Sequence, residues 1–174
     1  MSYIIRIDDR LVHGQVVEGW IKALGFDSIV VCADEVYCDE LSRQLFEISV
    51  PRHIKFLCYS VELTADSILK SVYDKMNSLI LLGSLKDLKQ LVKFVKEKLP
   101  TYTFPPVNIG GIRYVPGRKQ IYKALFLSKE DLNIIKEIVS FGLKLEYYVL
   151  PRDEKIPLND KIAEIEEIIE EKET

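Results

Sequence analysis

The side chains best suited to chemistry lie in a short stretch near the amino terminus, residues 6–15, which reads Arg-Ile-Asp-Asp-Arg-Leu-Val-His-Gly-Gln. His13 is its only good nucleophile at neutral pH, because a free imidazole has a pKa of about 6.5 and keeps an open lone pair near pH 7. Arg10 can hold two phosphate oxygens at once and stays charged. Gly14 lets the backbone approach a phosphoryl group closely. We therefore interpret the stretch as a phosphoryl-binding loop.

The elements on either side of this loop favour an anion site. Residues 3–7 form an apolar run typical of a buried strand, and residues 15–24 place apolar side chains on one side of a helix. The loop thus joins the carboxyl end of a strand to the amino terminus of a helix. At such a junction in an open parallel sheet, the first free backbone N–H groups of the helix point at the bound ligand.

Several polar residues of the loop have two possible roles. Asp8 or Asp9 accepts the imidazole N–H and fixes its tautomer, or instead caps the turn and pairs with Arg6. Gln15 either bonds the phosphate or only opens the helix. Both interpretations fit the sequence.

Apolar runs and helical spacings alternate along the rest of the chain. Strands are predicted over residues 28–33, 55–60, 78–83, 123–127 and 144–150, with one more just before Gly110. Helices are predicted over residues 39–50, 61–75 and 85–99, and from Ser128 to Phe141. The last two open with a Ser-x-x-Asp capping pattern, at Ser84 and Ser128. This alternation predicts an α/β fold, with an open, doubly wound, mostly parallel sheet and helices on both faces.

Composition argues against several classes of protein. With 174 residues and 48% hydrophobic content, the chain is long enough for one well-formed core. Its net charge of −3 argues against nucleic-acid binding, which needs a positive face. No apolar run approaches the roughly 20 residues that cross a bilayer, and no secretory signal is visible. The cysteines lack close spacing and the two histidines lie far apart, so we expect reduced thiols, no metal site and a cytoplasmic protein.

The loop sequence resembles a known family. Residues 6–16, followed by Gly19-Trp20, resemble the start of the IIB component of the mannose/fructose/sorbose family of the bacterial phosphoenolpyruvate-dependent sugar phosphotransferase system. In that family the histidine of this motif takes a phosphoryl group from a IIA histidine. It passes the group to a sugar that arrives through a membrane IIC–IID pair. The resemblance implies that His13 is the phosphoacceptor, and that the protein is often a homodimer.

A second segment extends the resemblance. Residues 107–111, Gly117-Arg118 and residues 128–131 are similar to later motifs of the family, so the likeness spans roughly residues 2–150. The family's sheet also carries a late antiparallel strand at one edge. From the side chains of the loop itself, we expect Asp8, Asp9 and Arg10 to be catalytic residues beside His13. The phosphate-binding residues expected from loop and resemblance together are Arg6, Gly14, Gln15, Asn108, Gly110 and Gly111.

The role of the glycine pair has an alternative. Gly110-Gly111 forms a flexible wall of the phosphoryl pocket, with Arg113 or Arg118 adding positive charge, or it is only a tight turn that needs positive φ. Phosphoryl transfer of this kind depends on positioning and charge stabilisation. It therefore needs no nucleotide, metal or organic cofactor.

The carboxyl-terminal residues 151–174 differ in charge from the rest. They hold nine acidic residues against four basic ones, and their isoleucines recur at helical spacing. We expect one IIB-like domain over residues 1–150, followed by an acidic amphipathic helix that packs on that domain or on a second subunit. Residues 96–106 form a longer connection than the family usually has, and this loop is a possible partner contact.

The sequence thus predicts a phosphocarrier of a sugar phosphotransferase system. His13 accepts the phosphoryl group from a IIA protein and passes it to a sugar during uptake. The protein works in the cytoplasm, at the inner face of the membrane, through its IIC–IID partner. One alternative is a regulatory phosphohistidine module that docks another protein, and a second is an anion-binding protein without turnover. The sequence does not name the sugar.

Overall fold

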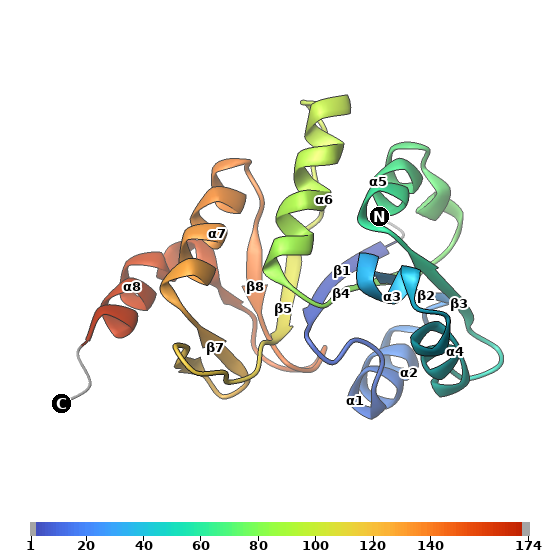
Figure 1. The fold of residues 1–174 in the computed structure, drawn as a ribbon, viewed down its shortest axis with the longest axis horizontal. Helices are drawn as coiled ribbons and strands as arrows, with labels where there is room; N and C mark the ends of the chain where they lie inside the picture. The colour runs from blue at the N-terminus through green and yellow to red at the C-terminus, as the bar shows by residue number, and fades with distance from the viewer. Residues whose placement is uncertain (1–2, 172–174) are drawn as a thin grey trace.

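Seven strands form one sheet in the computed structural model, which describes residues 3–171 (Figure 1). The strand order is β3-β2-β4-β1-β5-β8-β9, and every neighbouring pair is parallel except β8 with β9. The strands are β1 (Tyr3–Asp8), β2 (Ser28–Cys32), β3 (Lys55–Tyr59), β4 (Ser78–Leu82), β5 (Val107–Gly111), β8 (Leu145–Tyr147) and β9 (Ile156–Pro157). The predicted mostly parallel sheet with an antiparallel edge strand is confirmed.

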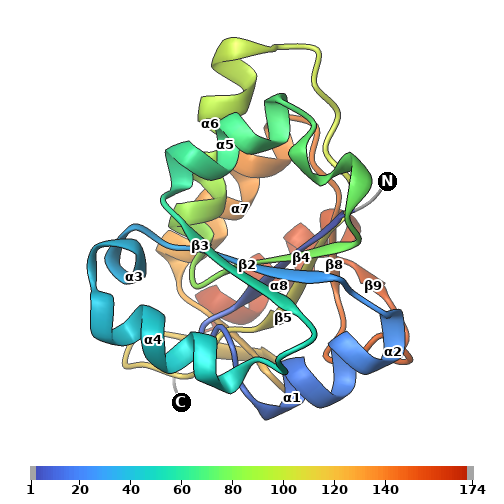
Figure 2. The same ribbon diagram turned by 90° about the vertical axis from the view of Figure 1, so that its right-hand side faces the viewer.

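Helices cover both faces of this sheet. Figure 2 shows α1, α2 and α4 below the strands and α5, α6 and α7 above them. The helical elements are α1 (Gly14–Val16), the π-helical turn η1 (Val17–Ile21), α2 (Lys22–Leu24), α3 (Asp34–Cys38), α4 (Glu40–Ser49), α5 (Val61–Leu69), the 3₁₀ turn η2 (Val72–Lys75), α6 (Leu85–Lys98), α7 (Lys129–Ser140), the 3₁₀ turn η3 (Leu158–Lys161) and α8 (Ile162–Glu170). Of these, α1, η1 and α2 follow one another without a break, so residues 14–24 form one helical segment.

Side chains of β1 alternate between two apolar cores. Ile5 and Ile7 pack into the core beneath α5, α6 and α7. Since successive side chains of a strand point to opposite faces, Arg6 and Asp8 face the other core, which is built around Trp20 of η1. Two charged residues thus enter the layer between the sheet and the first helical segment.

Local sequence signals set several helix boundaries, including the two predicted serine caps. The Ser84 hydroxyl accepts the Asp87 N–H at the start of α6. At the start of α7, Ser128 and Asp131 form a reciprocal capping box. Gly25 ends α2 with φ of 61°, in the left-handed region that glycine adopts at little cost.

The predicted helix over residues 61–75 is wrong in its second half. Helix α5 ends at Leu69, and Ser71 has a left-handed φ of 55° that turns the chain into η2. This turn buries the ring of Tyr73 beside that of Tyr3, with centroids 5.9 Å apart. Burial of a large aromatic side chain favours the turn over continued helix.

Two predicted strands also differ from the structure. Residues 125–127 form β7, which pairs antiparallel with β6 (Lys119–Tyr122) in a hairpin outside the main sheet. Residues 144–150 supply only β8, and the edge of the sheet is β9. The acidic residues after β2, Asp34 and Glu35, open the short helix α3. There Asp34 accepts the Val61 N–H at 2.8 Å.

The carboxyl-terminal segment contains the predicted helix, α8, which lies against α7 (Figure 1). Ile165 is fully buried there, and Lys136 of α7 forms an ion pair with Glu166 at 2.6 Å. Residues 172–174 of the predicted acidic segment lie outside the described residues. None of the helices within residues 3–171 is long and apolar enough to cross a bilayer.

The connection between α6 and β5 lies at the edge of the sheet where the strands begin. Its Tyr102 hydroxyl shares a 2.6 Å hydrogen bond with that of Tyr3, the first residue of β1. The rings of Tyr102 and Phe104 pack edge to face. The loop expected to meet a partner is therefore at the opposite edge of the sheet from His13, which follows the end of β1.

Candidate active site

Residues 9–13 form a short, strained loop between β1 and α1. The Leu11 N–H donates to the Asp8 carbonyl at 2.9 Å, and the Asp9 N–H donates to the Gly111 carbonyl at 3.2 Å. Leu11 itself has φ of 54°, a left-handed conformation that a branched side chain rarely adopts. Its side chain is buried in the core that contains Trp20, and this burial offsets the backbone strain. The loop is thereby held in one shape.

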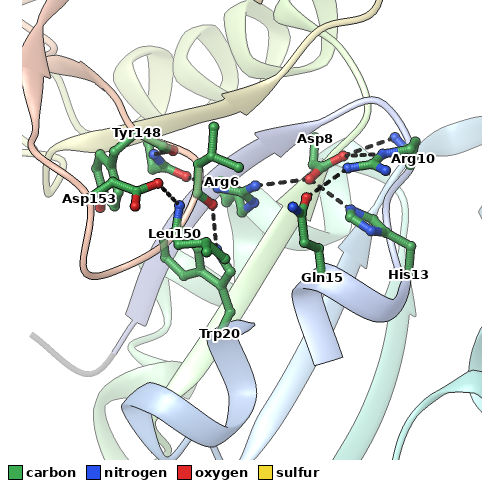
Figure 3. Close-up of polar contacts among 11 residues, drawn as sticks. Arg6, Asp8, Arg10, His13, Gln15, Trp20, Tyr148, Leu150 and Asp153 are labelled. Atoms are coloured by element: carbon green, nitrogen blue, oxygen red, sulfur yellow. Dashed lines mark hydrogen bonds and ion pairs between the residues drawn. The ribbon is translucent and has the colours of Figure 1, made fainter. Parts of the chain in front are cut away.

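His13 stands at the end of this loop, immediately before α1 (Figure 3). Its Nε2 lies 2.9 Å from a carboxylate oxygen of Asp8, and its side chain is 16% exposed. Within residues 3–171, Nδ1 has no hydrogen-bond partner. Because a carboxylate only accepts hydrogen bonds, the proton of a neutral ring resides on Nε2 and leaves the Nδ1 lone pair open.

Asp8 is buried, with three basic groups around it. The Arg6 Nη2 donates to it at 3.0 Å, and the Arg10 Nε lies 3.6 Å away. Burial by itself would raise the pKa of the Asp8 carboxyl, but the hydrogen bond with His13 and the charge of Arg6 outweigh it and hold this pKa below its usual value. Asp8 therefore stays ionised, so it both fixes the imidazole and pairs with Arg6.

Asp9 takes a different part in the loop. It accepts the Arg113 N–H at 2.8 Å and lies 3.4 Å from the Nε of the same arginine. Of the two aspartates that the sequence left open, Asp8 is the one that contacts His13. Asp9 ties the loop to the segment that follows β5.

Arg6 lies beneath Asp8, with only 1% of its side chain exposed. Its Nη1 donates to the Asn108 side-chain oxygen and its guanidinium carbon lies 4.5 Å above the Trp20 ring. Burial lowers the pKa of the guanidinium, and Asp8 opposes this shift. Arg6 and Asn108, which we predicted as phosphate-binding residues, are both buried. Among the described residues, the polar contacts that connect them with His13 pass through Asp8.

The glycine pair lies within β5 and is not a turn. Gly110 has an ordinary φ, but a Cβ on it would lie 1.9 Å from the Arg6 guanidinium carbon. Glycine is required there because the guanidinium occupies the space of a side chain. A Cβ on Gly111 would meet only ordinary contacts, at 3.8 Å from the Ala124 carbonyl oxygen and 3.9 Å from an Asp8 oxygen. The tight-turn interpretation is therefore wrong.

The side of His13 that faces solvent carries donors for an anion. Arg10 is 53% exposed, and its Nη2 donates to the Gln15 side-chain oxygen at 3.1 Å. The N–H groups of Gly14 and Gln15 open the helical segment and donate to no other described residue. A Cβ on Gly14 would meet nothing within 4 Å, so the protein's own packing does not require glycine there. The residues that flank His13 thus offer hydrogen-bond donors and, at Gly14, open space.

The two later arginines differ in their freedom. The Arg113 side chain is 72% exposed and stays near the loop through Asp9. Arg118 is held by Asp131 of α7 through two hydrogen bonds of 2.8 and 3.3 Å. Arg118 is therefore a structural partner of the α7 cap, whereas Arg113 remains close to the candidate site.

Comparison with known proteins gives this site a family. A sequence model described as the PTS system sorbose subfamily IIB component matches residues 2–173. The chain belongs to this family. It is a IIB component of the sugar phosphotransferase system, as its loop sequence predicted.

Similar proteins agree over nearly the whole length. The sorbose-specific EIIB component of Klebsiella pneumoniae is 32% identical over 161 residues, which cover 92% of this chain and 94% of that protein. The fructose-specific EIIB component of Bacillus subtilis is 31% identical, covering 86% and 88%. The crystal structure of the IIBSor domain of the Klebsiella pneumoniae sorbose permease superposes with a TM-score of 0.80 at 31% identity, covering 94% of this chain and 98% of that one.

Two contributors to this IIB site were not expected from the sequence. We assigned Trp20 no role at the site, yet its ring lies against the Arg6 guanidinium. The Tyr148 carbonyl accepts the Asn108 side-chain N–H at 2.9 Å and so orients it. Strand alternation was a usable signal for the contact between Arg6 and Trp20. It places Arg6 and Asp8 on one face of β1, and that face packs against the helical segment that contains Trp20. Nothing local marks Tyr148, since the contact joins β5 to the residue after β8, 40 positions further along the chain.

Proposed function

We propose that this IIB component is a phosphohistidine carrier that accepts a phosphoryl group on Nδ1 of His13 and transfers it to a sugar. One observation carries the proposal: Nε2 of His13 contacts Asp8 at 2.9 Å, whereas Nδ1 has no hydrogen-bond partner among residues 3–171. Arg10 on the same loop and the free N–H groups of Gly14 and Gln15 supply donors for an anion. The ring thus has one nitrogen for attack and one for its proton.

In the first step, the Nδ1 lone pair of His13 attacks the phosphorus of a phosphohistidine on a IIA protein. The Nδ1–P bond forms as the donor N–P bond breaks, and that electron pair stays on the donor nitrogen. Arg10 and the helix amino terminus stabilise the charge on the equatorial oxygens. The His13 ring becomes cationic, and the ionised Asp8 stabilises it through the Nε2 proton.

In the second step, a sugar hydroxyl oxygen attacks the phosphorus and the Nδ1–P bond breaks. The electron pair returns to Nδ1, so the ring leaves as a neutral imidazole that still carries its Nε2 proton. The hydroxyl proton passes to a base outside this chain or to water. Positioning supplies most of the catalysis, because the reacting groups meet in a fixed geometry.

The partners proposed are a IIA phosphocarrier and a membrane IIC–IID pair, which would hold the protein at the inner face of the membrane. A mannose-specific EIIAB component of Escherichia coli is 26% identical over 94% of this chain, which covers 49% of that protein. Its name combines A and B components, which supports a IIA partner. The sugar is one of the kinds that such systems import.

We also propose that residues 1–150 act as one IIB-like domain and that the protein forms a homodimer. The last helix gives no support for dimerisation, because its isoleucines are at least partly covered by its own chain. The large apolar residues most exposed on the described surface include Leu41, Leu45 and Ile48 of α4. Sedimentation of the purified protein tests the dimer. The regulatory alternative has no support among the relatives named above.

The decisive experiment measures phosphorylation from phosphoenolpyruvate through the general carriers and a IIA protein. Wild type should gain one acid-labile phosphoryl group by mass, and His13→Ala should gain none. The control His53→Ala, which alters an exposed turn residue, should be labelled like wild type. Arg10→Lys should be labelled about tenfold more slowly, since losing one charged hydrogen bond of about 1.5 kcal/mol slows transfer by that factor. A label that persists in His13→Ala would refute the proposal.

A further inference from the structure

We infer that Arg6 is a positioning residue for phosphoryl transfer, an inference that rests on the function proposed above. Its guanidinium holds the Asp8 carboxylate from beneath, and Asp8 in turn decides which nitrogen of His13 is free. Arg6 never touches the phosphoryl group.

The chain is built around this buried guanidinium. Gly110 has no side chain at the place where the guanidinium lies. Asn108, which pairs with Arg6 in the register of β1 and β5, accepts a hydrogen bond from the Arg6 Nη1. Trp20 covers one face at 4.5 Å and is itself fixed by a 3.0 Å hydrogen bond from its indole N–H to the Val149 carbonyl. Four elements, β1, η1, β5 and the segment after β8, therefore contribute to one side chain (Figure 3).

Stability alone does not account for an arginine at this position. Taking a charge out of water is expensive, and replacing a buried ion pair by apolar residues is often neutral or stabilising. One nitrogen of the guanidinium, Nε, is buried without any partner in the described chain. The two nitrogens that are paired reach Asp8 and Asn108, and Asp8 alone connects Arg6 with His13. A role in keeping Asp8 ionised and oriented accounts for the buried guanidinium.

Asp8 must satisfy two conditions to hold His13 in place, and Arg6 supports both. Asp8 must remain ionised although it is buried, and it must keep one orientation so that one oxygen faces His13. Without the guanidinium, the carboxylate loses its inner ion pair, and protonation or rotation becomes favourable. The His13 proton is then free to move to Nδ1, and that tautomer cannot attack phosphorus through Nδ1.

Arg6 and Arg10 thus divide the work. Arg10 is half exposed on the side where the phosphoryl group arrives, whereas Arg6 is sealed behind Asp8. Loss of Arg10 should affect the contacts of the transferring group. Loss of Arg6 should affect the tautomer of His13 before any donor is present.

The test compares Arg6→Met with wild type in a His53→Gln background, so that ¹⁵N NMR observes a single imidazole. Wild type should show the Nε2–H tautomer, and Arg6→Met should show a mixture with Nδ1–H. The kcat for phosphorylation by a phosphorylated IIA protein should fall about tenfold to a hundredfold, as for loss of other groups that orient a reacting ligand, while KM stays unchanged. Wild-type tautomer and kcat in Arg6→Met would overturn the inference.

Two further variants keep this test decisive. Gly110→Ala retains the charge of Arg6 but displaces the guanidinium, and it should shift the tautomer in the same direction even if Arg6→Met fails to fold. Leu91→Ala, a cavity in the core on the opposite face, lowers stability and should change neither tautomer nor kcat. A similar change in Leu91→Ala would overturn the inference. The NMR measurement needs no phosphoryl donor. If wild type is not phosphorylated by a IIA protein, the proposed function is refuted, but the tautomer of His13 still decides the role of Arg6.

Discussion

One buried carboxylate links the imidazole of His13 to the interior of the protein. Asp8 contacts His13 on its outer side and Arg6 on its inner side, at 2.9 and 3.0 Å. Removing one partner of a buried ion pair strongly destabilises the folded protein, because the other charge stays buried and unpaired. Asp8 should therefore matter for the fold and for the chemistry at once.

The pH dependence of stability should reveal this residue. The pKa of Asp8 is lower in the folded protein than its usual value of about 3.9, so its contribution is present in full above that value and is lost as the pH falls through the folded-state pKa. Asp8→Asn should lower the free energy of unfolding by about 3–5 kcal/mol at pH 7, because Arg6 loses its counter-charge. The difference should shrink in acid, where wild type also loses the carboxylate.

Urea denaturation at pH 7, 5 and 3 measures this difference. Asp9→Asn is a matched control, since Asp9 is partly exposed and contacts a surface arginine. Its effect on stability should stay small at every pH. If Asp8→Asn lowers the free energy of unfolding by the same amount at pH 3 as at pH 7, the lowered pKa of Asp8 is contradicted.

Among the elements, helix α7 depends on the cap that its sequence encodes. The Ser128 hydroxyl accepts the Asp131 N–H at 3.1 Å and Asp131 accepts the Ser128 N–H at 2.9 Å. Asp131 also accepts a hydrogen bond from the Arg118 Nε. Burial alone would raise the pKa of the Asp131 carboxyl, but the hydrogen bonds from Arg118 and Ser128 hold this pKa below its usual value. The cap therefore joins α7 to the segment that follows β5.

Ser128→Ala should lower the free energy of unfolding by about 1 kcal/mol, the typical loss for an N-cap hydroxyl. Ser140→Ala, at the other end of α7, removes a hydroxyl that only bonds the Glu137 carbonyl and should change stability by less than about 0.5 kcal/mol. Thermal or urea unfolding of both variants gives the comparison. Equal losses at the two ends would show that the capping box contributes nothing specific.

Elements with local signals were predictable from the sequence, and those set by distant contacts were not. The buried strands and the caps at Ser84 and Ser128 were visible because apolar runs and capping pairs are local. The break at Ser71 was missed because a tertiary contact of Tyr73 decides it. The loop around His13 was recognised from its residue types, but the burial of Arg6 depends on β5, about a hundred residues away in sequence.

At the scale of the whole molecule, the acidic carboxyl-terminal segment completes the core on the side of α7. Leu158 and Ile165 are fully buried, and Ile162 and Ile169 pack against the same cluster. Ion pairs from Lys129 and Lys136 of α7 reach the glutamates of α8. These contacts place α8 against its own chain.

Ile165→Ala should lower the free energy of unfolding by about 2–5 kcal/mol, because it leaves a cavity between α7 and α8. Glu167→Ala, an exposed neighbour on the same helix, should change it by less than about 0.5 kcal/mol. If α8 packs within one chain, the loss in Ile165→Ala should be the same at low and high protein concentration. A loss that grows with dilution would mean that α8 instead covers a second subunit, since only association makes stability depend on concentration.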